Sequence, residues 1–350
     1  MPQARKRLVS TEMTPFYHVI SRCVRRQFLC GLDPLTGRDY SGRKQEIKDR
    51  LALLAEVFAI NVCAYAILSN HYHLVLHINP ESATEWDDLD IARRWTRLFT
   101  GPALVRAFVS GQSLTESQQK VVRKHIRQYR KRLCDLSWFM KCLNEPIARK
   151  ANAEDNVTGH FWQARFNSQA LLDEAAVLTA MSYVDLNPIR ASIADTPETS
   201  DFTSVQQRIE DWKSRKARQE AGSDRNASNP PSDSAPLDET IVRLLGFSDD
   251  GANGDKTTIP YSTTDYLALV DWSGRAIIEG KSGSIPGHLP PILQRLKINP
   301  EQYLAYIRKP RSGFANALGA LDKLKDFARH FEKAFLKGQT AAAALFSPGR

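Results

Sequence analysis

The sequence predicts an α+β fold: an antiparallel sheet with helices packed on one face, followed by a smaller, mostly helical C-terminal domain. Segments in which apolar and polar side chains nearly alternate occur before residue 80 and again after residue 159, and segments with helical apolar spacing lie between them. Large apolar side chains then almost vanish over Ser214–Leu237, and helical spacing returns after residue 260.

The first half of the sheet is predicted from residues 16 to 78. Phe16–Cys23 reads as a strand, because aromatic and β-branched residues nearly alternate, and Arg43–Ala59 has the apolar spacing of a helix. Two further strands are predicted at Asn61–Leu68 and His71–Ile78. Ser69-Asn70 between them favours a tight hairpin.

The next hundred residues are predicted to be mainly helical before the sheet resumes. Trp86–Ala153 is polar and helical in pattern, with Pro146 expected to bend or break its last helix. His160–Leu171 is predicted to be the fourth strand. Asp173–Asn187 is predicted to be a helix that its first residue caps and that Pro188 ends.

These elements predict a division of the chain into three parts. Residues 1–200 form the α+β domain, with a helical insertion at about 83–135. Residues 201–255 are expected to be a flexible linker, because this stretch is rich in Ser, Asn, Pro and charged residues. Residues 256–350 form the helical C-terminal domain.

Composition narrows the function classes. Lys and Arg total 48 against 39 Asp and Glu, a net charge of +9 that favours a polyanion such as nucleic acid as partner. The five cysteines are odd in number and include no C-x-x-C pair, which argues against a disulfide framework and a cysteine zinc site. We expect a cytoplasmic protein that neither crosses nor enters a membrane.

His71 and His73 are the first candidate site residues. They lie two apart on a predicted strand, so both imidazoles leave the same face and can share one divalent ion. His77 lies on that face too. The competing interpretation is an ordinary polar strand face, solvated or hydrogen-bonded.

Tyr183 and Asn187 are the second pair. They are four apart on the predicted helix and therefore point from one face, about one turn apart. The competing interpretation is that Tyr183 packs in the core and Asn187 caps the helix end before Pro188.

Taken together and in order, these motifs resemble the REP-associated tyrosine transposases, single-tyrosine members of the HUH nuclease superfamily. The strings that carry the resemblance are FYHVISRCVRRQFLCG, SNHYHLVL, HFWQARFNSQAL and YVDLNPIRAS, within about residues 13–205. Tyr72 stands in the middle of the H-x-H motif, where many members carry an apolar residue. The long segment after this motif and the C-terminal domain also depart from the compact members.

The resemblance implies a ferredoxin-like or RRM-like HUH core and a defined chemistry. Tyr183 would be the nucleophile that cuts single-stranded DNA, and His71 and His73 would bind the metal. Asn187 matches a third ligand position. A carboxamide oxygen suits Mg²⁺ or Mn²⁺ better than structural zinc. The implied substrate is single-stranded DNA, with palindromic or hairpin repeats, cut through a 5′-phosphotyrosine intermediate.

A basic helix is the main candidate for DNA contact. Gln118–Leu133 contains seven Lys and Arg and no acidic residue, which fits phosphate contact, although a solvated charged face is the alternative. Its candidate contacts are Lys120, Arg123, Lys124, Arg127, Arg130 and Lys131. Further candidates are Arg22, Arg25, Arg26 and Arg165.

Two other functions remain open at this point. A hairpin-specific DNA- or RNA-binding protein would use the same surfaces without strand transfer. A hydrolytic metalloenzyme built on the H-x-H motif would need another strong ligand, such as His18, His77 or a carboxylate, and would not require Tyr183.

Overall fold

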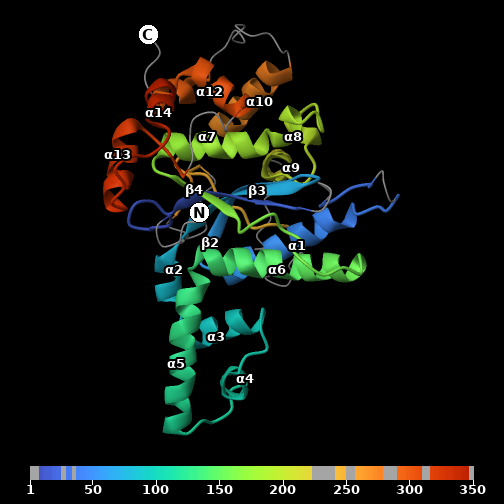
Figure 1. Ribbon diagram of the computed structural model, residues 1–350, viewed down its shortest axis with the longest axis vertical. Coiled ribbons are helices and arrows are strands. Elements are labelled where there is room, and N and C mark those ends of the chain that lie inside the picture. The colour runs from blue at the N-terminus through green and yellow to red at the C-terminus, as the bar shows by residue number, and fades with distance from the viewer. Residues whose placement is uncertain are drawn as a thin grey trace.

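The computed structural model describes residues 8–24, 29–33, 37–222, 241–249, 257–278, 290–309 and 316–346, without the side chains of 218–222. The fold is α+β, as the sequence predicts, with one sheet and many helices (Figure 1). No helix within these ranges is long and apolar enough to cross a membrane.

The sheet has the strand order β2-β3-β1-β4-β5. Its strands are β1 (Phe16–Arg22), β2 (Ile60–Ile67), β3 (His71–Ile78), β4 (Asn167–Leu171) and β5 (Ala317–Leu318). All neighbours are antiparallel except β4 and β5, which are parallel. The C-terminal part of the chain therefore contributes an edge strand. At two residues, this strand is too short to be predicted from hydrophobic periodicity.

The fourth strand is shorter than predicted. Only Asn167–Leu171 of the expected His160–Leu171 pairs as a strand, and Trp162 forms an isolated bridge with Cys23. Gln163, Ala164 and Arg165 are exposed one after another, so the inside-outside alternation of a strand fails there.

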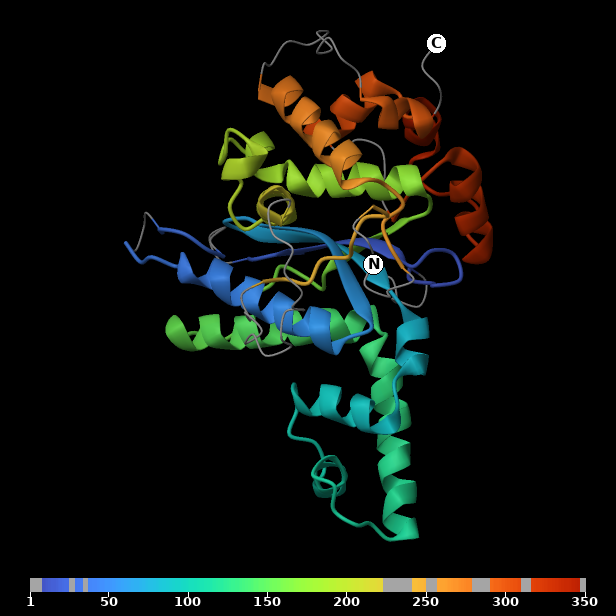
Figure 2. The same cartoon turned by 180° about the vertical axis from the view of Figure 1, so that it is seen from behind.

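Helices cover both faces of the sheet, and the expectation of one covered face is wrong (Figures 1 and 2). Helices α1 (Gly42–Val57) and α6 (Leu136–Glu154) lie on one face, and α7 (Glu174–Asp185) and α9 (Ser204–Gly222) lie on the other. The reason lies in the central strands, because β3 is buried along its length except at its first residue. A strand that is buried on both faces requires two covering layers, even though one face of β3 carries His71, His73 and His77.

Helix α6 continues through Pro146, so of the two predicted outcomes, a bend or a break, the break does not occur. A proline at this position cannot donate the hydrogen bond to the carbonyl of Cys142, four residues earlier. The side chain of Arg50, on α1, donates to that carbonyl instead, at 2.9 Å. A long-range contact thus satisfies the oxygen that the proline leaves without its helical partner.

The predicted helical insertion projects away from the sheet as an arm (Figure 1). It comprises α2 (Pro80–Glu85), α3 (Asp88–Thr96), α4 (Ala103–Val109) and α5 (Glu116–Leu133). The rings of Trp95 on α3 and Tyr129 on α5 stack with centroids 4.4 Å apart, and Arg132 lies over the Trp95 and Trp138 rings. These contacts give the arm a small aromatic core.

The chain after residue 200 packs on the α+β core. Two short elements precede it, α8 (Asn187–Arg190) and η2 (Pro197–Thr199). Its helices after α9 are α10 (Thr263–Ile278), α11 (Pro291–Arg295), α12 (Pro300–Arg308), α13 (Leu321–His330) and α14 (Gln339–Leu345). Helices α10 and α12 pack on α7, and one hydrophobic cluster includes buried residues from both parts.

The linker prediction is wrong for residues 204–222, which form α9, while 223–240 lie outside the described residues. The hydroxyl of Ser204 accepts from the backbone N–H of Tyr65 on β2, and Val205 is fully buried. Residues 202–203 and 244–245 lie along the outer edge of β2, where Leu245 N–H donates to the Val62 carbonyl at 2.8 Å.

Candidate active site

Strand register places four histidines on one face of the sheet, and His18, His71 and His73 lie close together there. On β1 and β3, Ile20 lies opposite His73, Arg22 opposite His71 and His18 opposite Val75. Since alternate residues share a face, His18, His71 and His73 point to the same side. On the other neighbour of β1, Gln169 lies opposite His18.

Helix α7 brings Tyr183 onto this histidine face. Asp173 caps the helix as predicted, accepting from the Ala176 N–H at 2.8 Å. The Tyr183 ring lies 5.4 Å from the His73 ring and 5.8 Å from the His18 ring, centroid to centroid, in edge-on geometry. The structure therefore brings the predicted nucleophile and the predicted metal-binding histidine into contact distance.

Tyr183 and Asn187 do not share one continuous helix, which differs from the prediction. Helix α7 ends at Asp185, and α8 begins at Asn187. Arg190 joins the two residues: one terminal nitrogen of its guanidinium donates to the Tyr183 hydroxyl at 3.2 Å and to the Asn187 carbonyl oxygen at 2.9 Å.

Sequence reasoning missed Arg190 as a site residue. The arginine lies seven residues after Tyr183 and three after Asn187, a spacing that returns to the same face of a helix. This spacing could have indicated Arg190, but the helix was expected to end at Pro188, before the arginine. The guanidinium carbon also lies 5.1 Å from the centroid of the Tyr183 ring.

Buried polar atoms without a partner concentrate at this site. Among the described residues these atoms are His73 Nε2, Asn187 Nδ2, Arg190 Nε and Arg208 Nε. The first three belong to the residues around Tyr183. An unsatisfied buried polar atom costs about 1–3 kcal/mol, so such a cluster is expected where a protein recognises a ligand.

The two histidines of the H-x-H motif each engage Nδ1. His71 Nδ1 hydrogen-bonds the side-chain oxygen of Asn70, and His73 Nδ1 lies 2.9 Å from His18 Nε2. Burial, followed by nearby positive groups, lowers the pKa of His73 well below its usual range, and burial lowers the pKa of His18 to about 4. Both rings are therefore neutral near pH 7, the form in which imidazole binds a metal.

The predicted metal donors are two imidazoles and one carboxamide oxygen. No three His, Cys, Asp or Glu side chains among the described residues group closely enough to hold an ion. The donors available are the imidazoles of His71 and His73 and the buried carbonyl oxygen of Asn187, which Arg190 already engages with one of its hydrogen bonds. A carbonyl oxygen keeps a second lone pair for a cation.

The extra ligand that a hydrolytic metalloenzyme needs is not supplied by the histidines considered for it. His77 points its Nδ1 toward Asn61, 3.4 Å away, and its ring packs on Phe16. His18 bonds His73 itself through Nε2.

The exposed cations of α5 form a stripe, which we call the α5 basic stripe, on the side opposite its buried seam. The seam consists of Val122, Ile126, Tyr129 and Leu133. The stripe consists of Lys120, Arg123, Lys124, Arg127 and Lys131. Lys120 forms an exposed ion pair with Glu116, a contact worth little in solvent.

Arg130 does not belong to this stripe, because its guanidinium contacts other parts of the arm. Its guanidinium donates to the carbonyls of Ala83 and Trp86 and pairs with Asp88 at 3.1 Å. Arg130 thus joins α5 to the end of α2 and the start of α3. Burying those carbonyls without it would leave acceptors unsatisfied.

Of the remaining predicted DNA contacts, the structure places one on the sheet and one in the loop before β4. Arg22 lies opposite His71 and on the histidine face. Arg165 is exposed in the loop that precedes β4. Arg25 and Arg26 lie outside the described residues.

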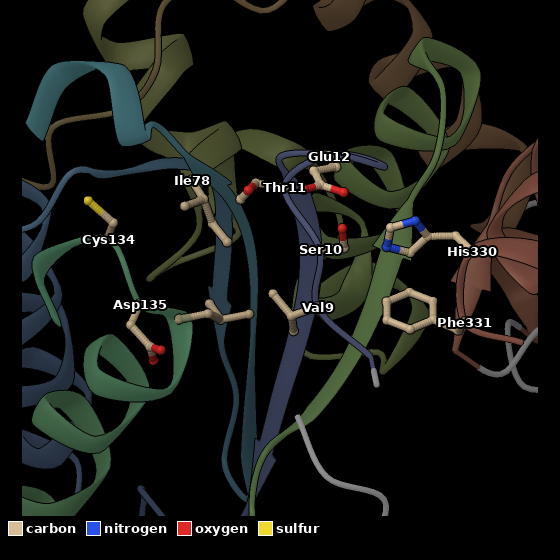
Figure 3. Close-up of a pocket in the computed structure, with 10 residues that line it drawn as sticks. Val9, Ser10, Thr11, Glu12, Ile78, Cys134, Asp135, His330 and Phe331 are labelled. Atoms are coloured by element: carbon tan, nitrogen blue, oxygen red, sulfur yellow. The ribbon is translucent and has the colours of Figure 1, made fainter. Parts of the chain in front are cut away.

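A separate cavity of 380 Å³ lies elsewhere on the molecule (Figure 3). It is lined by the N-terminal turn at Ser10 and Glu12, the start of α6 at Asp135, and His330 and Phe331 at the end of α13. It shares no residue with the histidine–tyrosine cluster.

Comparison with known proteins gives one distant structural neighbour. No protein-family model matches the chain, and no curated protein matches it. A solved structure of a REP-associated tyrosine transposase bound to a REP hairpin is similar to it with a TM-score of 0.35 and 10% sequence identity. The similarity covers 60% of this chain and 86% of the other.

Proposed function

We propose that this protein cuts and rejoins single-stranded DNA through a covalent bond to Tyr183, with Mg²⁺ or Mn²⁺ bound by His71, His73 and Asn187. The observation that carries the proposal is the arrangement around one hydroxyl: Arg190 donates to Tyr183 Oη at 3.2 Å, and the Tyr183 ring abuts His73. The unpartnered atoms of His73, Asn187 and Arg190 support a ligand at the same place.

The chain's own groups account for the attack. Tyr183 Oη forms a bond to the scissile phosphorus while the bond from phosphorus to the 3′ oxygen breaks. The phenolic proton ends on that oxygen, which leaves a 5′-phosphotyrosine and a free 3′-hydroxyl. The reverse reaction with another 3′-hydroxyl rejoins the strand without ATP, because the phosphodiester energy stays in the intermediate.

Arg190 supports this attack electrostatically. A tyrosine hydroxyl has an unperturbed pKa of about 10 and is a weak nucleophile near pH 7. The guanidinium at Oη favours negative charge on this oxygen and, during attack, on the phosphoryl oxygens beside it. A bound divalent ion would add Lewis-acid polarisation of the phosphate.

DNA binding would extend from the histidine face to the α5 basic stripe. Arg22 lies beside the site, and the stripe lies on the projecting arm. Neutralisation of phosphates by such cations supplies affinity without reading sequence. The sheet face would hold the cut position, and the arm would hold a flanking segment such as a hairpin stem.

A covalent-adduct assay tests the proposal. Labelled single strands that contain hairpins are incubated with the protein and Mg²⁺ or Mn²⁺ and run on a denaturing gel, where an SDS-resistant adduct is expected. Mass spectrometry should locate the adduct on Tyr183, and Tyr183→Phe should form none. The matched control is Tyr306→Phe, whose ring centroid lies 6.2 Å from that of Tyr183.

Two results would count against strand transfer. Full cleavage by Tyr183→Phe would exclude the covalent mechanism. Tight hairpin binding with no adduct in either ion would instead indicate a hairpin-binding protein.

A further inference from the structure

Three polar side chains form a line across three adjacent strands. Gln169 on β4, His18 on β1 and His73 on β3 lie on the histidine face of the sheet. Gln169 hydrogen-bonds the His18 side chain, and His18 Nε2 lies 2.9 Å from His73 Nδ1. His18 and His73 are only 4% and 2% exposed, so water cannot substitute for these contacts.

The hydrogen bond between the two rings allows only two proton arrangements. If His73 Nδ1 carries the proton and donates, His73 Nε2 holds a lone pair. If His18 Nε2 carries the proton and donates, His73 Nε2 must carry an N–H. His73 Nε2 is buried and has no partner among the described residues, so the second arrangement buries an unpaired donor beside Tyr183.

The first arrangement completes the line with paired donors. His73 Nδ1–H donates to His18 Nε2, and His18 Nδ1–H then donates to the side-chain oxygen of Gln169. The remaining atom, His73 Nε2, carries the lone pair that a cation requires. His71 has a parallel arrangement, since its Nδ1 is engaged by Asn70.

We propose that His18, supported by Gln169, is a positioning residue that holds His73 as its Nδ1–H tautomer and so makes Nε2 the metal donor. This inference rests on the metal site of the proposed function but not on DNA cleavage. Metal-binding histidines commonly donate their other N–H to a fixed acceptor, and loss of that acceptor typically costs 10- to 100-fold in metal affinity. In this site a neutral imidazole takes the acceptor's place.

Nuclear magnetic resonance of histidine-labelled, metal-free protein tests the tautomer directly. The eight histidines include His73, whose ring signals are identified by their absence in His73→Ala. We expect the Nδ1–H tautomer in the wild type. His18→Phe, which keeps a ring but lacks an acceptor, should shift His73 toward the Nε2–H tautomer, and His18→Gln, which restores an acceptor, should shift it back.

Binding of Mn²⁺ alone, followed by electron paramagnetic resonance of the free ion, gives the second readout. We expect affinity to fall by about 10- to 100-fold in His18→Phe and by less in His18→Gln. The matched control is His77→Phe, because His77 shares the strand face but hydrogen-bonds Asn61. Its Mn²⁺ affinity should stay within about threefold of the wild type, a shift well below the 10-fold expected at His18.

The outcomes separate this inference from strand transfer. An Nε2–H tautomer at His73 in the wild type, no Mn²⁺ binding by the wild type, or unchanged affinity in folded His18→Phe would overturn it. If His18→Phe does not fold by circular dichroism, Gln169→Leu decides, since loss of the outer partner should also weaken binding. A wild type that has the tautomer and binds Mn²⁺ but forms no DNA adduct would refute strand transfer alone.

Discussion

Replacement of Arg190 by Met should slow DNA cleavage while leaving the fold intact. The guanidinium makes two hydrogen bonds in this site, to Tyr183 Oη at 3.2 Å and to the Asn187 oxygen at 2.9 Å. Only the first bears on the attacking oxygen. Arg190 is partly exposed, so methionine can occupy the space of its aliphatic stem without burying a charge.

The size of the effect follows from that one contact. A hydrogen bond to a charged group contributes about 1.5–3 kcal/mol. If the whole contribution acts on the transition state, the rate falls by about 10- to 150-fold, since each 1.4 kcal/mol is a factor of ten. The cleavage rate of Arg190→Lys should lie between those of the wild type and Arg190→Met, because lysine keeps the positive charge but lacks the planar guanidinium.

Single-turnover cleavage at saturating DNA and fixed Mg²⁺ measures this rate without a contribution from binding. The matched control is Arg275→Met on α10, where an exposed arginine pairs with exposed Asp271 four residues earlier on the same helix. A folded Arg190→Met protein that cleaves within about threefold of the wild-type rate would refute the assigned role, because the reasoning above requires at least tenfold.

Three further predictions concern the metal site, the arm and the C-terminal helices. His73→Ala should abolish cleavage but spare most DNA affinity in a filter-binding assay, and Asn187→Ala should weaken metal dependence less, because water can replace a neutral oxygen ligand. Tyr266→Phe should lower the free energy of unfolding by about 1.5–3 kcal/mol in urea titration, because its hydroxyl donates to the buried Asp185 carboxylate; an unchanged midpoint would contradict this. Replacement of Arg123, Lys124 and Arg127 in the α5 basic stripe by Gln should reduce the slope of log K against log salt concentration by roughly two, at about 0.7 per phosphate contact. An unchanged slope would mean that this face is only solvated.

The elements that could be predicted from the sequence are those whose determinants are local. The β2–β3 hairpin follows from strand alternation on both sides of Ser69-Asn70, and the start of α7 follows from the Asp173 cap. The meeting of His73 and Tyr183 was expected only because the strings resemble a family. Hydrophobic periodicity alone does not indicate that the strand face with His73 and the helix face with Tyr183 meet.

The features that could not be predicted depend on contacts between distant segments. In the sequence, Arg130 resembles the other cations of a basic helix. Its hydrogen-bond partners, however, are backbone carbonyls 44 and 47 residues earlier in the chain. Arg50 compensates for Pro146 from a different helix. Burial of α7 on both sides requires the C-terminal helices, which no local pattern places there.

The partial covering of β2 and β4 by the chain after residue 200 has a consequence for self-association. β5 covers the free side of β4, and residues 202–203 and 244–245 cover parts of the outer side of β2. Unpaired strand edges are templates on which further copies of a chain can add. A fragment cut after residue 200 would expose the outer sides of β2 and β4, together with the outer side of α7, and should form aggregates. We therefore expect the segments after residue 200 to limit edge-to-edge association of this chain.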